Sequence, residues 1–290
     1  MTAPEFDIPA ALEQALNAHR PLVYCRLVAT FGSTPQKAGA TMLVFPAGGQ
    51  AGSVGGGLLE AEVQHAARQA WGDGRPRIVT RTLDHDSGQD QDQGLTCGGR
   101  VTTWLLPAAP ASPAARYCRH VCELARAGQG TEVVVFDGQA AGLPAADCYL
   151  TSAHGELVAA LSAAPGLPAV VRQHLRPLAA RPLAYAAQGV AFLPWLPRCR
   201  LVIVGGGHVG RAVADLAAQL EFDIWIVDDR AEFVTAERFP QAQRRVAGNL
   251  ADVLPALDIT PDTYCLIMTR GHAQDAIALY HLVNRPARFV

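Results

Sequence analysis

Two glycine-rich stretches of this sequence stand directly before segments with helical periodicity. The first is GSVGGG at residues 52–57, and the second is GGGHVG at residues 205–210. Glycine lets the backbone turn tightly, and the free N–H groups at a helix start, with the positive end of its dipole, stabilise a negative charge. Each stretch therefore predicts a binding site for a phosphate or another oxyanion.

The second stretch has the spacing of a dinucleotide-binding turn. Gly205, Gly207 and Gly210 follow the pattern G-x-G-x-x-G between an apolar strand and a helix. Asp228 follows 23 positions after Gly205, at the end of the next strand, where a carboxylate accepts from a ribose hydroxyl. Arg230 would favour a 2′-phosphate, so the choice between NAD and NADP is open. A Rossmann-type domain that keeps its glycines for packing and binds no dinucleotide is the alternative.

Polar residues follow a later apolar strand of the C-terminal region. Arg270, His272 and Asp275 lie in MTRGHAQD, directly after TYCLI. Because open α/β sheets bind ligands at the carboxyl ends of their strands, these side chains are expected at one crevice. His208 stands at the start of the helix that follows the glycine turn. For each of these residues, a ligand contact and an ordinary surface or structural role are both open.

The N-terminal region adds two further turns. GSTPQKAGATM at 32–42 contains Lys37, and GLTCGG places Cys97 directly before Gly98 and Gly99. The first glycine stretch lacks the lysine and threonine of a Walker P-loop, which excludes a nucleoside triphosphate site of the Walker type, although its backbone donors still suit a phosphate. A thiol among exposed backbone amides is acidified and acts as a metal ligand or nucleophile, whereas most free cysteines are buried as small hydrophobic residues. Both interpretations are open for Cys97.

Hydrophobic periodicity predicts the elements that position these residues. Helices are expected at 7–19, 58–71, 113–127 and 211–220. Strands are expected at 21–30, 41–46, 76–85, 100–107, 131–137, 147–153, 200–204, 222–229 and 263–269. Beyond the proline-rich LPWLPR, strands alternate with helices, which predicts parallel pairing. We therefore expect an α/β protein, with an N-terminal α/β domain at 1–195 and a C-terminal Rossmann-like parallel-sheet domain at 199–290.

Composition narrows the class of protein. Among 290 residues, 50% are hydrophobic and 17% charged, and the formal net charge of −2 comes without a long basic run, which argues against nucleic acid as a partner. The N-terminus lacks the features of a signal peptide, and no apolar run reaches the roughly 18 residues needed to span a membrane. Seven scattered cysteines fit reduced thiols, and Cys118 and Cys122, one helical turn apart, lack further zinc-spaced ligands. A cytoplasmic protein is expected.

The motifs taken together resemble the XdhC/CoxI family. The resemblance rests on GSTPQKAGATMLV, GSVGGGLLEAEV and GLTCGG, followed by VGGGHVGRAVA, VDDR and MTRGHAQD, in both halves and in the same order. It implies a chaperone without turnover of its own that binds molybdenum cofactor (molybdopterin). Such a protein supports exchange of an oxo for a sulfido ligand with a cysteine desulfurase and delivers the cofactor to xanthine dehydrogenase or a related molybdenum hydroxylase. The family also implies a homodimer.

The resemblance suggests why two glycine turns are present. The cofactor carries a phosphate and a metal held by a dithiolene, so the two loops are expected to hold different parts of one ligand, or two ligands, one a nucleotide. Gly55, Gly56 and Gly57 are assigned to phosphate or pterin contact. Cys97 is assigned to the molybdenum side. The glycines of the second turn are assigned to a further phosphate. The expected cofactor-binding residues are Gly32, Ser33, Lys37, Ser53, Gly55, Gly56, Gly57, Glu60, Cys97, Gly98, Gly99, Gly205, Gly207, His208, Gly210, Asp228, Arg230, Arg270 and His272.

Two other functions stay open. A nicotinamide-dependent oxidoreductase would use the C-terminal domain with NAD(P), although the sequence has no clear Tyr-x-x-x-Lys pair or other proton relay. A regulatory module that senses a nucleotide is the other. The sequence departs from the family at one point, since members usually continue past the last strand into a basic turn and further helices, whereas this sequence stops at PARFV. A shortened chain, or a Rossmann sheet without its last part, is therefore expected.

Overall fold

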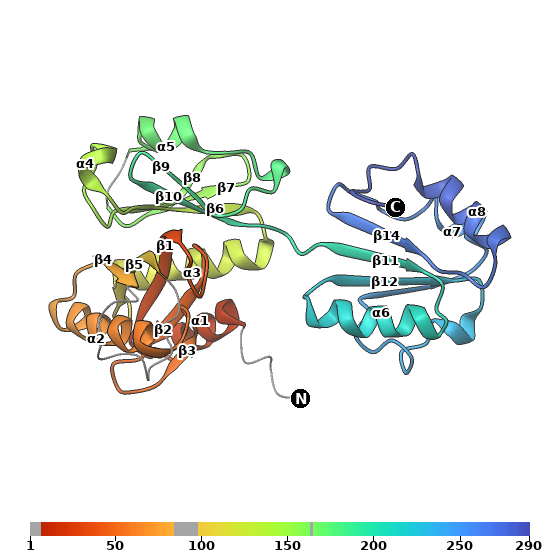
Figure 1. Cartoon of the computed structure of the whole chain (residues 1–290), viewed down its shortest axis with the longest axis horizontal. Coiled ribbons are helices and arrows are strands. Elements are labelled where there is room, and N and C mark those ends of the chain that lie inside the picture. The colour runs from red at the N-terminus through yellow and green to blue at the C-terminus, as the bar shows by residue number, and fades with distance from the viewer. Residues whose placement is uncertain (1–6, 84–97, 163–164) are drawn as a thin grey trace. The chain divides into compact units, whose positions relative to one another are not determined.

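The chain folds into two compact units, Met1–Leu196 and Pro197–Val290. The computed structural model describes residues 7–83, 98–162 and 165–290 (Figure 1). Each unit has its own sheets and its own buried clusters, and each is described separately below. In the described part of the chain, no helix is long and apolar enough to cross a membrane.

The first sheet of the N-terminal unit has five strands in the order β3-β2-β1-β5-β4, all antiparallel. The strands are β1 (Leu22–Gly32), β2 (Thr41–Val44), β3 (Gln50–Gly52), β4 (Arg77–Leu83) and β5 (Gly99–Ala108). Helix α2 (Gly57–Asp73) covers one face, because its apolar residues recur at helical spacing and are buried there. Helices α1 (Ile8–Asn17) and α3 (Pro113–Ala127) pack on the other face.

The second sheet has the order β8-β7-β6-β10-β9 and is also antiparallel. Its strands are β6 (Gly130–Val135), β7 (Cys148–Ser152), β8 (Leu157–Ala160), β9 (Tyr185–Ala187) and β10 (Val190–Trp195). The short helices beside it are α4 (Gly138–Ala141), α5 (Ala169–His174) and the 3-10 turn η1 (Leu178–Ala180). One buried cluster contains side chains of both sheets together with α1 and α3, so the two sheets share a core.

A buried ion pair joins the two sheets. Arg26 of β1 and Glu132 of β6 are 4% and 0% exposed, and the Arg26 Nε lies 2.9 Å from Oε2 of Glu132. The hydroxyls of Tyr24 and Tyr117 donate to the Glu132 carboxylate at 3.1 and 3.4 Å. Burial raises the pKa of Glu132, and Arg26 and the two hydroxyls oppose this shift. Arg26 also donates to the carbonyl of Gly39 at 2.9 Å, so this network fixes the end of the GSTPQKAGA segment.

The C-terminal unit has the expected Rossmann-type architecture. Four parallel strands have the order β13-β12-β11-β14. They are β11 (Arg200–Val204), β12 (Asp223–Asp228), β13 (Arg244–Ala247) and β14 (Thr263–Ile267). Figure 1 shows α6 (His208–Gln219) along one face, and α7 (Leu250–Val253) and α8 (His272–Leu282) along the other. A 3-10 turn, η2 (Ala231–Phe233), follows β12. The α/β fold class is therefore confirmed, and among the described strands parallel pairing occurs in this unit and antiparallel pairing in the other.

The start of α6 differs from the sequence prediction. The helix begins at His208, three residues before the predicted start at 211, with Gly207 as its N-cap. The periodicity places the start later because Gly210, inside the helix, lowers its apparent helical tendency. The structure therefore places His208 and Val209 in the first turn of the helix. The structure also contains β13 and α7 between the predicted strands at 222–229 and 263–269. The sequence analysis did not predict these two elements.

Candidate functional site

The N-terminal motifs meet at one end of the first sheet. Gly32, the last residue of β1, is the register partner of Gly99, the first residue of β5. A Cβ atom at Gly99 would lie 2.2 Å from the carbonyl oxygen of Ser33, so the two turns pack backbone against backbone. A Cβ atom at Gly55 would lie 2.9 Å from Cβ of Pro35. Segments 32–37, 52–57 and 98–99, which we call the motif cluster, therefore lie together.

Cys97 lies outside the described residues, and its assignment to molybdenum stays a prediction. Its neighbour in the sequence, Gly98, is exposed at the motif cluster. Ser33 and Lys37 are exposed as well.

The amides of the first glycine turn are partly occupied by the turn's own side chains. The Gly55 amide donates to Oγ of Ser53 at 3.1 Å, and the Gly56 amide donates to Oε1 of Glu60 at 3.0 Å. The Ser53 hydroxyl donates to the same Glu60 oxygen at 2.5 Å, and Gln50 donates to the other oxygen at 3.0 Å. Partial burial raises the pKa of Glu60, but these hydrogen bonds outweigh it and hold the pKa below its usual value. Ser53 and Glu60 therefore order the turn.

The open part of this turn lies one residue further on. Cβ atoms at Gly56 and Gly57 would meet nothing within 4 Å, and both residues have positive φ, +77° and +57°, which favours glycine. Gly57 is exposed at the first position of α2, and no group among the described residues accepts from its amide. An anion at this turn would therefore use the amides from Gly57 onward.

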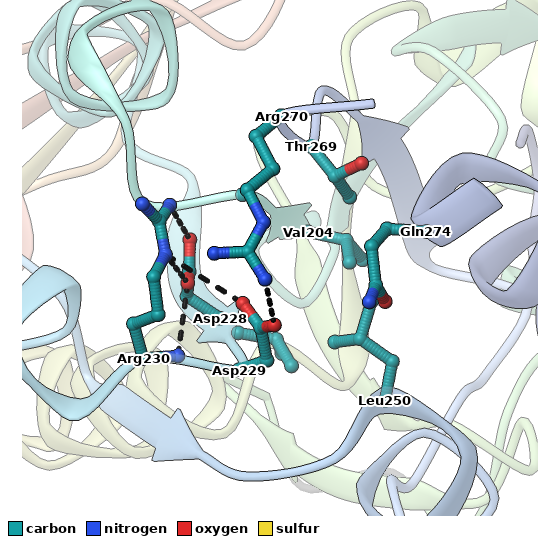
Figure 2. Close-up of a pocket in the computed structure, with 10 residues that line it drawn as sticks. Val204, Asp228, Asp229, Arg230, Leu250, Thr269, Arg270 and Gln274 are labelled. Carbon is teal, nitrogen blue, oxygen red and sulfur yellow. Dashed lines mark hydrogen bonds and ion pairs between the residues drawn. The ribbon is translucent and has the colours of Figure 1, made fainter. Parts of the chain in front are cut away.

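The C-terminal unit has a small hollow at the carboxyl ends of β11, β12 and β14, where parallel sheets bind ligands (Figure 2). Its lining residues come from the end of β11 and the turn after it, from the VDDR segment (227–230) at the end of β12, from Leu250 of α7 and from the TRGHAQD segment after β14. The structure thus brings the predicted residues Gly205, Asp228, Arg230 and Arg270 to one place. We call this hollow the Rossmann crevice.

The glycines of the second turn differ in what they do. A Cβ atom at Gly205, whose φ is +122°, would lie 2.2 Å from the carbonyl oxygen of Met268. A Cβ atom at Gly210 would lie 2.0 Å from the carbonyl oxygen of Gly205. Gly207 has a φ of −67°, which any residue adopts, and a Cβ atom there would meet nothing within 4 Å. Packing therefore requires glycine at 205 and 210, whereas at 207 it does not, and the contact of Gly207 with a phosphate stays a prediction.

The Asp228 carboxylate accepts hydrogen bonds from neighbouring groups of the protein. It is 4% exposed and accepts from the Gly206 amide at 2.8 Å. It also accepts from the Arg230 amide, Nε and Nη2 at 3.0, 3.0 and 3.2 Å (Figure 2). A carboxylate has about four lone-pair sites. Burial raises the pKa of Asp228, but the bonds from Arg230 and Gly206 lower it below its usual value. A ribose hydroxyl would have to replace one of these donors.

Arg270 also lines the crevice, whereas Arg238, His208 and His272 are not among its lining residues. Arg270 donates to Asp229 at 2.8 Å and keeps half of its side chain exposed. Arg238, which the sequence did not single out, donates to the carbonyl of Gly206 at 3.0 Å and lies beside the Phe233 ring, as Arg230 does. His208 and His272 are exposed at the first positions of α6 and α8. Asp275 accepts from Thr269 and is a structural residue at the start of α8.

Replacing Asp228 by asparagine should destabilise the C-terminal unit by about 1–3 kcal/mol at pH 7, because charge-assisted hydrogen bonds to Arg230 and Gly206 are lost. The pKa of Asp228 is lowered in the folded state, so its contribution is present above the unfolded value and is lost as the pH falls through the folded value. The stability difference between wild type and Asp228→Asn should therefore shrink below about pH 4. Thermal unfolding at several pH values measures it, with the exposed Glu237→Gln as control. A difference of equal size at pH 7 and pH 3 would contradict this role.

The described cysteines offer no metal site. Burial raises the pKa of the Cys25, Cys118 and Cys148 thiols, and that of Cys122 and Cys265 to about 12 and about 11. Such thiols stay protonated at neutral pH. Across residues 7–83, 98–162 and 165–290, no group of three or more His, Cys, Asp or Glu side chains could hold a metal ion.

Comparisons with known proteins agree with this architecture. Escherichia coli K12 has an uncharacterised protein, YqeB, that is 26% identical over 267 residues. The match covers 92% of this chain but 32% of YqeB, so the chain spans about a third of the length of that curated relative. A crystal structure described as a xanthine dehydrogenase from Bacillus halodurans has the same fold, with a TM-score of 0.71 and 22% identity. That match covers 97% of this chain and 81% of the other.

Two family models match the two units. The model described as the XdhC and CoxI family matches residues 15–83, and the model described as the XdhC Rossmann domain matches residues 201–290. Together they cover more than half of the chain and include segments 32–37 and 52–57 of the motif cluster as well as the whole Rossmann crevice. With both regions present in this order, the chain belongs to the XdhC and CoxI family.

Proposed function

We propose that this protein binds molybdenum cofactor and serves the maturation of xanthine dehydrogenase or a related molybdenum hydroxylase. The observation that carries the proposal is the convergence of three glycine-containing turns at the motif cluster. Membership of the XdhC and CoxI family supports the role in maturation. The protein acts as a carrier, receives the sulfido ligand with the help of a cysteine desulfurase, and works as a cytoplasmic homodimer.

The residues of the motif cluster fit such a cofactor. The open space at Gly56 and Gly57 admits a ligand close to the backbone, and the Gly57 amide and Lys37 provide donors for a phosphate. Cys97, which directly precedes the exposed Gly98 in the sequence, supplies a thiolate, the kind of ligand that soft metals prefer. When bound, the cofactor supplies the molybdenum and its exchangeable oxo or sulfido ligand.

The chain's own residues hold this cluster in shape. Ser53 and Glu60 fix the glycine turn, so Gly57 is presented without rearrangement. Arg26 holds the carbonyl of Gly39 and thereby the end of the segment that contains Lys37. A preorganised seat of this kind lowers the ordering cost of binding.

The Rossmann crevice takes a second, phosphate-bearing group. The free space at Gly207, the start of α6 and the partly exposed Arg270 support this assignment. A nicotinamide-dependent oxidoreductase is less well supported, because the four donors on Asp228 occupy the carboxylate that an NAD ribose would use.

Removal of the Cys97 thiol tests the assignment at the motif cluster. The Cys97→Ala variant, purified from cells that make molybdenum cofactor, should retain less than about a tenth of the molybdenum of wild type, because a metal contact is lost. Elemental analysis measures the molybdenum. The matched control is Cys199→Ser, since Cys199 is a partly exposed cysteine of the other unit. Equal molybdenum content in Cys97→Ala and wild type would contradict the assignment of Cys97 to molybdenum.

A further inference from the structure

A polar groove lies beside the motif cluster in the N-terminal unit. It encloses about 1010 Å³, part of it open to solvent. Phe31 and Arg100, which line it, directly adjoin Gly32 and Gly99 of the motif cluster in the sequence. The opposite wall comes from the segment after β6, including Asp137. The groove therefore opens next to the place where we propose that the cofactor binds.

An irregularity in β1 turns Phe31 toward this groove. Leu27 pairs with Thr103 of β5, but Ala29 pairs with Thr102, so one residue of β1 has no partner and the register shifts. Such a bulge moves the following residues to the opposite face of the sheet. Without it, Phe31 would point to the face covered by α2. With it, Phe31 is the register partner of Arg100 and shares a face with Thr102.

The Phe31 ring is exposed where a core residue would be buried. Its relative exposure is 73%, although it lies in a strand whose first seven residues are all buried. The guanidinium carbon of Arg100 lies 5.9 Å from the ring centroid. An aromatic ring beside a guanidinium provides a stacking surface for a flat heterocycle.

The rest of the groove provides hydrogen-bonding groups. Thr80 and Thr102 line it, and their hydroxyls share a hydrogen bond at 3.1 Å, which leaves each with further capacity. Asp137 accepts two backbone amides with Oδ1, both at 3.1 Å. No described group donates to its Oδ2. A carboxylate oxygen fixed in this way accepts from adjacent N–H donors of a ligand.

We propose that this groove binds the pterin ring of the cofactor, with Phe31 as the stacking platform and Asp137 as the acceptor for its aminopyrimidine N–H groups. The inference rests on the proposed function, because it assigns the organic part of the same ligand. A pterin is flat, fused and polar at its edges, which matches an exposed ring within a groove lined by hydroxyl, carboxylate and guanidinium groups. In this arrangement the ring would lie beside the turn to which we assign the phosphate.

Titration with free pterin (2-amino-4-oxopteridine), followed by its fluorescence, tests the groove. Phe31→Leu and Asp137→Asn should each weaken pterin binding about tenfold. Both variants should fold, because Phe31 is exposed and asparagine caps a helix as well as aspartate does. The control Tyr280→Leu removes an aromatic ring that is 76% exposed in the other unit and should bind pterin as wild type does.

No saturable binding by wild type up to roughly 1 mM pterin, or equal affinity in wild type and both variants, would overturn the proposal. The molybdenum content of the same preparations separates this failure from that of the proposed function. Molybdenum in wild type, with pterin affinity unchanged in the variants, overturns the groove alone. Pterin binding that depends on Phe31 and Asp137, in a protein that never carries molybdenum, supports the groove and overturns the carrier function.

Discussion

Replacing either Arg26 or Glu132 by alanine should destabilise the N-terminal unit by about 3–5 kcal/mol, because each change leaves the other charge buried and unpaired. Both side chains are almost fully buried, and the pair also engages Tyr24, Tyr117 and Gly39. For a unit of this size the melting temperature should fall by roughly 10 °C. The double variant Arg26→Met/Glu132→Leu should recover most of the loss, since an apolar pair of similar volume leaves no buried charge.

Differential scanning calorimetry can follow the two units as separate transitions. The control is Arg126→Ala, which breaks the exposed ion pair between Arg126 and Glu13 in the same unit and should cost less than about 1 kcal/mol. If Arg26→Ala costs no more than Arg126→Ala, or if the double variant is as unstable as the single ones, the buried pair does not have this role. The double variant should still lose affinity for the cofactor, because the hydrogen bond from Arg26 to the carbonyl of Gly39 is then missing.

Alanine at Gly205 or Gly210 should destabilise the C-terminal unit by about 2–4 kcal/mol. In each case the new Cβ atom would lie within 2.2 Å of a backbone oxygen, and Gly205 also has a positive φ. Because the clashing atom is a backbone oxygen, the clash is relieved only if α6 moves away from β11 and β14. The helix propensity gained by alanine at 210, about 1 kcal/mol, does not offset this clash. The melting temperature of the C-terminal transition, measured by calorimetry, should fall by about 10–20 °C.

Gly207→Ser is the matched control for these two variants. Serine is a good N-cap and meets no neighbour at this position, so stability should be unchanged or slightly higher. Its side chain would occupy the space left for a ligand, so binding of inorganic pyrophosphate, measured by calorimetric titration, should weaken. A large loss of stability in Gly207→Ser, or none in Gly205→Ala, would show that the roles of these glycines are assigned wrongly.

Sequence patterns predicted the elements of this fold where local signals are strong. Helix α3 coincides with its prediction at 113–127, since Ser112 caps it, Pro113 opens it and Gly128 ends it. The short apolar strand before Gly205 and the strand ending at Asp228 predicted parallel pairing, which the structure confirms. The candidate residues after these strands meet because the carboxyl ends of parallel strands share an edge.

Interactions between distant segments could not be predicted from local patterns. The pairing of Arg26 with Glu132 depends on two sheets meeting, although a lone charge within the apolar segment LVYCRLVA was a signal for a buried partner. The bulge that exposes Phe31 depends on the register with β5. Glu60 and Asp228 were expected to contact a ligand. In the structure their carboxylates accept hydrogen bonds from Ser53 and Arg230. Their ligand contacts stay predictions.

Carriage of molybdenum cofactor can be measured by comparing protein from two kinds of cells. Wild-type protein should be purified from cells that make the cofactor and from cells that cannot make it. Each preparation is then analysed for molybdenum and, after oxidation, for pterin fluorescence. If the protein carries the cofactor, we expect molybdenum and pterin in similar molar amounts in the first preparation and neither in the second. Protein from the first cells that holds neither molybdenum nor pterin would contradict it.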